Sequence, residues 1–148
     1  MIEQLQNDIK KAMLAKQGNV LLVLRALKNE ITNAALRKGN VNEPLTDVEV
    51  LGLIRKEISK REDSIKIFNE GNRADLAVKE QLEIEVLNQY LPVEMSEGEL
   101  TMIIDNTINI LGATNKRDMG KVIKIVAEQV NGRADNKRIS AMVGQKLA

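Results

Sequence analysis

The side chains best suited to chemistry are the basic ones near the C-terminus. Residues 113–148 carry eight lysine or arginine side chains and three acidic ones, a local charge of +5, whereas residues 1–92 carry fourteen of each sign. Clustered cations attract phosphate backbones because binding releases condensed counterions. A solvated helix surface would have the same composition, so charge alone leaves both interpretations open. Seven of these cations lie close together in the sequence: Lys116, Arg117, Lys121, Lys124, Arg133, Lys137 and Arg138.

The residue types do not favour catalysis by this chain alone. It contains no cysteine and no histidine, which removes thiolate nucleophiles, imidazole bases and most zinc chemistry. The sequence also has no hydrolase serine motif, Walker-type phosphate loop or dinucleotide fingerprint. Carboxylates two residues apart, such as Glu83 and Glu85, point to different sides of a helix and do not converge on a metal or substrate. We expect no catalytic residue, no metal and no cofactor.

The aromatic content limits how an RNA could be bound. Phe68 and Tyr90 are the only aromatic residues, so platforms on which single-stranded bases stack are nearly excluded. Any RNA bound here should be recognised through its shape and its phosphate backbone.

Two residues interrupt otherwise regular helical patterns. Gly120 lies early in a predicted helix, where glycine costs roughly 1 kcal/mol relative to alanine, so a close neighbour should compensate. That neighbour could be another helix, an RNA backbone or a partner chain. Arg61 occupies a position where the period expects an apolar residue, and it could either extend its charge to solvent at a bundle edge or form an interdomain ion pair.

Helical periodicity runs through the N-terminal part, and no alternating strand pattern competes with it. Gly18 should end the first helix, and Asn19 should cap the second. Thr46 and Glu49 form a capping box ahead of the third. The predicted helices span residues 2–16, 19–39, 47–69 and 72–90.

Pro92 marks the predicted domain boundary, which separates residues 1–92 from residues 93–148. Ser96 caps the first helix that follows, and Asp135 caps the last. We predict an all-α fold, with a four-helix bundle-like N-terminal domain and a small three-helix C-terminal domain. The helices expected after the boundary span residues 97–111, residues 116–130 and a segment beginning after Asp135. The apolar face expected for the first of these consists of Met102, Ile103, Ile110 and Leu111.

The N-terminus mixes acidic and basic residues and lacks the features of a signal or transit peptide. No apolar run approaches the roughly 20 residues that cross a bilayer. Together with the absence of cysteine, these features predict a soluble protein with no membrane partner and a cytoplasmic location.

Four short motifs carry a family resemblance: "KREDSIKIF" at 60–68, "YLP" at 90–92, "DMGKV" at 118–122 and "NGRAD" at 131–135. Together they closely resemble the YqeY-like family over essentially the whole chain. The C-terminal part is also similar to the tail domain of the B subunit of the tRNA-dependent amidotransferase, which amidates Glu-tRNA or Asp-tRNA.

The resemblance implies a helical two-domain protein whose tail-like part contacts the body of a tRNA. The kinase and amidase centres of the amidotransferase lie in regions that this chain lacks, so a carbon-nitrogen ligase activity would belong to a complex. Matched to the tail domain and combined with the basic cluster, the expected RNA-contacting residues are Lys116, Arg117, Gly120, Lys121, Lys124, Gly132, Arg133, Lys137 and Arg138.

Three functional hypotheses follow. The first is a tRNA-associated binding module. The second is an adaptor that docks on amidotransferase-like or synthetase-like proteins through the seam between its two domains. Glycines and the methionines Met119 and Met142 suit such close, adaptable contacts. The third is an accessory component of a carbon-nitrogen ligase complex.

Overall fold

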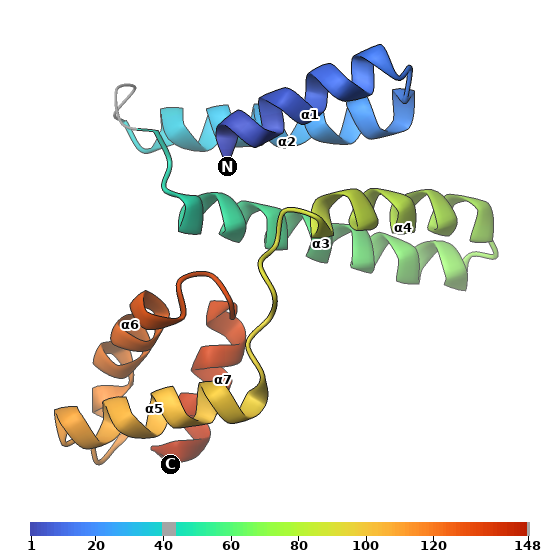
Figure 1. The fold of residues 1–148 in the computed structure, drawn as a ribbon. Coiled ribbons are helices and arrows are strands. Elements are labelled where there is room, and N and C mark those ends of the chain that lie inside the picture. The colour runs from blue at the N-terminus through green and yellow to red at the C-terminus, as the bar shows by residue number, and fades with distance from the viewer. Residues whose placement is uncertain (40–43, 148) are drawn as a thin grey trace. The chain divides into compact units, whose positions relative to one another are not determined.

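The computed structural model describes residues 1–39 and 44–147, and every regular element in these ranges is helical (Figure 1). The all-α fold class is therefore confirmed. The chain divides into two compact units, Met1–Leu91 and Pro92–Ala148. No helix within the described ranges is both long and apolar enough to cross a membrane.

The N-terminal unit consists of two pairs of helices, because α1 lies along α2 and α3 lies along α4 (Figure 1). Helix α2 also packs on both α3 and α4. Leu24, Ile54 and Leu87 are almost fully buried at the centre of this packing. The described helices of this unit are α1 (Ile2–Leu14), α2 (Gly18–Arg37), α3 (Asp47–Glu70) and α4 (Ala74–Asn88).

The predicted N-cap of α2, Asn19, was wrong by two residues, because Gln17 occupies that position. Lys16 has a left-handed backbone with φ of 55°, and the chain turns there. Gly18 then begins α2 instead of ending α1, and Asn19 lies inside the helix. In contrast, the capping role of Thr46 is confirmed, since the Glu49 N–H donates to Thr46 Oγ1 at 3.2 Å.

The C-terminal unit packs its three α-helices around a core whose centre is fully buried. Helix α6 contacts both α5 and α7. The capping signals are confirmed: Ser96 Oγ accepts the Glu99 N–H at 3.2 Å, and Asp135 Oδ1 accepts the Arg138 N–H at 2.8 Å. The elements are α5 (Glu97–Leu111), the short 3-10 helix η1 (Lys116–Asp118), α6 (Met119–Val130) and α7 (Asn136–Lys146).

The predicted apolar face of α5 was largely wrong. Met102 and Ile110 are 67% and 81% exposed, whereas Leu100, Ile104 and Thr107 are buried. The buried residues recur at steps of four and three, so they also satisfy the helical period. Thr107 can occupy the inward position because its hydroxyl donates to the carbonyl of Ile103 at 2.8 Å.

Candidate nucleic-acid interface

The predicted basic cluster is centred on α6, which is strongly amphipathic. Val122, Val126 and Val130 are buried on one face, and this orients Lys121 and Lys124 toward solvent one turn apart on the other. The helical spacing that places the valines in the core therefore also places these two lysines at the surface.

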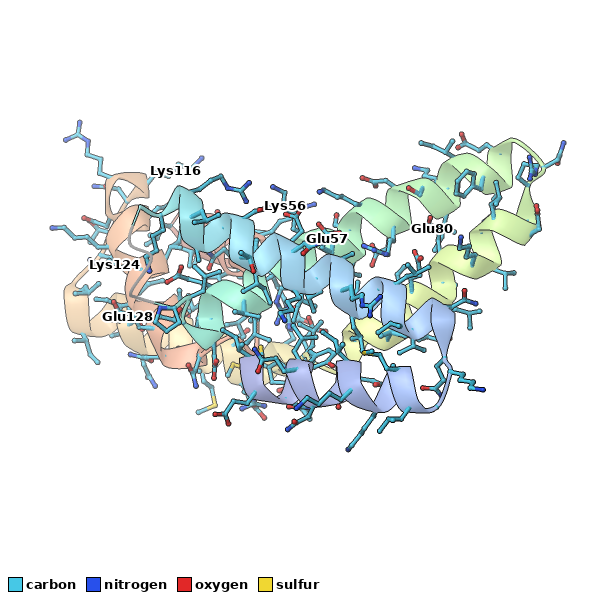
Figure 2. All side chains as sticks on the ribbon, turned by 90° about the horizontal axis from the view of Figure 1, so that it is seen from above. Lys56, Glu57, Glu80, Lys116, Lys124 and Glu128 are labelled. Carbon is cyan, nitrogen blue, oxygen red and sulfur yellow. The ribbon has the colours of Figure 1, made fainter. Side chains whose placement is uncertain are left out.

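The turn before α6 adds two more exposed cations. Asn115 Oδ1 accepts the main-chain N–H of Arg117 at 2.9 Å, and Asp118 Oδ2 accepts that of Thr114 at 3.2 Å. These bonds hold η1, and with it Lys116 and Arg117, directly ahead of the helix. Figure 2 shows Lys116, Lys124 and Glu128 one after another along this part of the unit.

Four cations thus lie on η1 and α6, and we call them together the basic α6 surface: Lys116, Arg117, Lys121 and Lys124. All four are exposed, and within the described ranges none takes part in an ion pair. Their charges are available to an external anion.

Gly120 lies between these cations in the sequence, and the described residues leave open space beside it. A Cβ atom added there would meet nothing within 4 Å. The expectation that a neighbouring helix packs against this glycine was therefore wrong. Gly120 is exposed, and its backbone is open to an approaching ligand.

Arg133 makes contacts inside the C-terminal unit that the sequence did not indicate. Its Nε donates to the carbonyl of Val93 at 3.1 Å, and its Nη2 pairs with Glu99 Oε2 at 3.3 Å. Its main-chain carbonyl accepts the N–H of Met95 at 2.8 Å. The guanidinium therefore holds the segment that precedes α5.

Arg138 holds the same segment from α7. Its Nη1 donates to the carbonyl oxygen of Met95 at 2.7 Å, and Arg138 is half-buried. Arg133 and Arg138, two of the three arginines in the predicted RNA-contacting set, thus have structural partners, and neither belongs to the basic α6 surface.

The last two residues predicted to contact RNA, Gly132 and Lys137, lie in different environments. Gly132 is buried with φ of 82°, in a backbone conformation that other residues rarely adopt. It completes the turn after α6, where Asn131 is also left-handed. Lys137 is exposed in the first turn of α7.

The charge of the folded C-terminal unit is smaller than that of its last segment. Residues 92–148 carry eight basic and seven acidic side chains, a net charge of +1, because the segment around α5 contributes only acids. Glu99 pairs with Arg133, and Asp105 pairs with Lys146 at 2.8 Å. The positive charge left for a ligand is thus that of the basic α6 surface and of Lys137.

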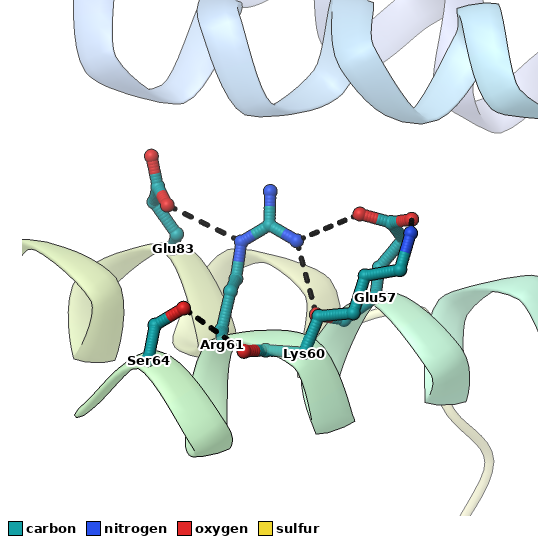
Figure 3. A network of polar contacts seen from close by, with 5 residues as sticks. All are labelled: Glu57, Lys60, Arg61, Ser64 and Glu83. Atoms are coloured by element: carbon teal, nitrogen blue, oxygen red, sulfur yellow. Dashed lines mark hydrogen bonds and ion pairs between the residues drawn. The ribbon is translucent and has the colours of Figure 1, made fainter. Parts of the chain in front are cut away.

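The structure explains the second interruption of the helical pattern, which is Arg61 in the N-terminal unit. It bridges α3 and α4, with Nη1 2.9 Å from Glu57 Oε2 and Nε 3.2 Å from Glu83 Oε2 (Figure 3). Neither expectation for Arg61 was right. Its charge is not extended to solvent, and its ion pairs join helices of one unit instead of two domains. Burial would raise the pKa of Glu57, yet hydrogen bonds from Arg61 and Lys60 hold it below its ordinary value.

Within residues 1–39 and 44–147, no group of acidic side chains is arranged to hold a metal ion. The described site is thus a surface of backbone and cations. Such a surface can neutralise phosphates, but it has no acid-base pair aimed at a reacting atom.

These features define an all-helical protein of two units, the second presenting an exposed basic helix face. Residues 2–147 match the family model described as "Yqey-like protein", and the chain belongs to this YqeY-like family. The resemblance read from the four sequence motifs is confirmed.

Curated relatives in fungi are similar over most of the chain. The protein named "Altered inheritance of mitochondria protein 41, mitochondrial" from Pyrenophora tritici-repentis is 32% identical, covering 99% of this chain and 82% of its own length. Its namesake from Lachancea thermotolerans is 31% identical, covering 96% and 78%. That from Saccharomyces cerevisiae is 29% identical, covering 93% and 72%.

The expectation of a cytoplasmic location is contradicted by these relatives, whose names place them in mitochondria. The expectation rested on the absence of cysteine and on the character of the first residues. A cysteine-free chain is compatible with any compartment, so the cytoplasmic assignment is withdrawn.

Proposed function

We propose that this protein is a tRNA-associated binding module whose basic α6 surface contacts the phosphates of structured RNA. The observation that carries the proposal is the group of four exposed cations, free of ion pairs in the described ranges, around the open backbone at Gly120. Cations without internal partners lose no ion pair when they bind phosphate. The likeness of residues 118–122 and 131–135 to the amidotransferase tail favours tRNA as the RNA.

The proposal narrows the set of contact residues. Lys116, Arg117, Lys121 and Lys124 bind phosphate directly, and Lys137 adds an exposed charge on α7. The remaining members support the fold around them, since Arg133 and Arg138 hold residues 93–95 and Gly132 forms a turn.

The adaptor alternative loses the feature that suggested it. Met119 and Met142 both pack against the core of the C-terminal unit. The methyl group of Met119 lies 3.6 Å from where a Cβ would stand at Gly144. These contacts explain the methionines by internal packing, so RNA binding is the better-supported function.

The test is binding of unmodified tRNA to the full chain over a range of salt concentrations. The logarithm of the association constant should fall with the logarithm of salt at a slope of roughly −0.7 to −0.9 per phosphate contacted. The double variant Lys121→Glu with Lys124→Glu should bind at least about tenfold more weakly, with a slope shallower by about two contacts.

A matched control is available on α2, where Arg25 and Lys28 are exposed with the same spacing of three residues. Reversing both of them changes the net charge equally but should leave tRNA affinity nearly unchanged. Equal weakening by the two double variants would show that only overall charge matters. That result would contradict the assignment to α6.

A further inference from the structure

A groove of about 310 Å³ lies between α2 and α4 of the N-terminal unit. Its apolar walls are Val20 and Val23 on α2 and Leu82 and Val86 on α4. This volume lies at the lower end of the range, about 300–1,000 Å³, that binding pockets occupy. We call it the α2–α4 groove.

Helix α4 carries apolar side chains on two sides, and the described residues bury one side almost completely and the other only in part. Ile84 and Leu87 are buried in the core. On the other side, Val78 and Leu82 are 60% and 53% exposed, and Val86 continues the same row four residues later. A row of apolar side chains left beside a groove marks a surface that binds another apolar surface.

The groove side of α4 also has more negative than positive charge. Glu83 and Glu85 line the groove, Glu80 lies one turn earlier, and Lys79 is the one cation among the lining residues. Arg61 offsets only part of this negative charge, because its guanidinium pairs with Glu83 and is shared with Glu57. Burial and then the neighbouring charge of Glu83 raise the pKa of Glu80, as expected where carboxylates outnumber cations.

We propose that the α2–α4 groove binds an amphipathic helical segment of a partner protein, with lysine or arginine side chains flanking its apolar stripe. The lining residues of α4 run from Lys79 to Gln89, which spans about 15 Å at 1.5 Å per residue. That length accommodates two to three turns of a helix, as in other helix-in-groove complexes. The apolar stripe contacts Leu82 and Val86, and the basic flank pairs with Glu85, since Glu83 already pairs with Arg61.

This inference is independent of RNA binding, because it concerns the other unit and the opposite charge. The probe is a synthetic helical peptide of about 14 residues, with leucines at helical spacing and lysines on either side of them. A second peptide has every lysine replaced by glutamate. Binding to the isotopically labelled full chain is followed by NMR, and affinity is measured with fluorescently labelled peptide.

The lysine peptide should shift the NMR signals of α2 and α4, and the glutamate peptide should not. Leu82→Lys should weaken binding at least about tenfold, since it introduces a charge into the apolar contact. The control is Ile67→Lys on α3, which changes an equally apolar and 67% exposed side chain outside the groove. Its affinity should match that of the unchanged protein, and circular dichroism confirms that both variants fold.

Three outcomes would overturn the proposal. The first is equal affinity of the Leu82→Lys and Ile67→Lys variants, or of the two peptides. The second is absence of binding at millimolar peptide. The third is a concentration-dependent dimer whose NMR shifts lie on α2 and α4, because the occupant would then be a second copy of this chain.

Discussion

Arg138 Nη1 donates a hydrogen bond of 2.7 Å to the main-chain carbonyl oxygen of Met95, 43 residues earlier in the chain. Arg133 donates to the carbonyl of Val93 in the same segment. Two arginines that the sequence grouped with the RNA-binding cations therefore hold the segment leading into α5. A loss of RNA binding on changing them would report a change of fold as well as of charge.

Arg138→Ala should lower the free energy of unfolding by about 1.5–3 kcal/mol, because it removes a hydrogen bond from a charged donor to the carbonyl of a buried residue. Urea denaturation of the full chain measures this loss. The neighbouring change Lys137→Ala is the control. Lys137 is exposed, so its removal should alter stability by less than about 0.5 kcal/mol. Equal stability of the two variants would show that the bond to Met95 contributes nothing.

Gly120→Ala should stabilise the protein by up to about 1 kcal/mol, because alanine is the better helix former and the site is open. Thermal unfolding measures the gain. Gly112→Ala should act in the opposite direction, since Gly112 ends α5 with φ of 63°. If tRNA approaches the backbone closely at Gly120, the same alanine weakens binding while it stabilises the fold. Destabilisation by Gly120→Ala would contradict the open environment described above.

Glu80→Gln should stabilise the protein at neutral pH by roughly 0.5 kcal/mol, because it removes a partly buried charge beside another carboxylate. The pKa of Glu80 is raised in the folded state, so the folded protein takes up this proton before the unfolded chain does. The advantage of glutamine should therefore shrink as pH falls through the folded pKa toward the ordinary value of 4.5. Denaturation at several pH values tests this. Glu62→Gln, an exposed change on α3, is the control. A pH-independent gain would point to packing instead of charge.

Tyr90→Phe should lower stability by about 1 kcal/mol at neutral pH, because Tyr90 is buried and its hydroxyl donates to the Asp8 carboxylate. Burial, and then this bond, raises the pKa of Tyr90 above its ordinary value of 10.0. Above pH 10 the unfolded chain loses the tyrosine proton while the folded protein keeps it, so stability falls as pH rises. The difference between the two proteins should therefore narrow in that range. The chain has a single tyrosine, and a tyrosinate absorbance titration with an ordinary midpoint would refute the prediction.

The sequence predicted helix ends well where a side chain bonds to its own first turn. Ser96 and Asp135 cap α5 and α7 as expected, because each bond joins residues three apart. The prediction failed between α1 and α2, where the turn uses the left-handed backbone of Lys16. Lysine has no special preference for that conformation, so no local signal marks the turn.

The buried face of α5 was harder to predict, because apolar residues occur on all sides of this helix. Met102, Ile110 and Leu111 are spaced as plausibly as Leu100 and Ile104, and Thr107 is a polar residue that the apolar pattern does not include. Packing against α6 and α7 decided between these faces. A threonine whose hydroxyl bonds to the preceding turn costs little when it is buried.

The sequence alone determined the helical fold class, the family and the group of cations that includes the RNA-binding candidates, since periodicity, caps and motifs are local properties. Only the tertiary structure decided which of these cations form ion pairs and which have none within the described ranges. Glu99 pairs with Arg133, 34 residues later in the chain, and Asp105 pairs with Lys146 of the same unit. An ion pair depends on the distance between side chains in space. Local sequence carries no information on that distance until the helices have packed.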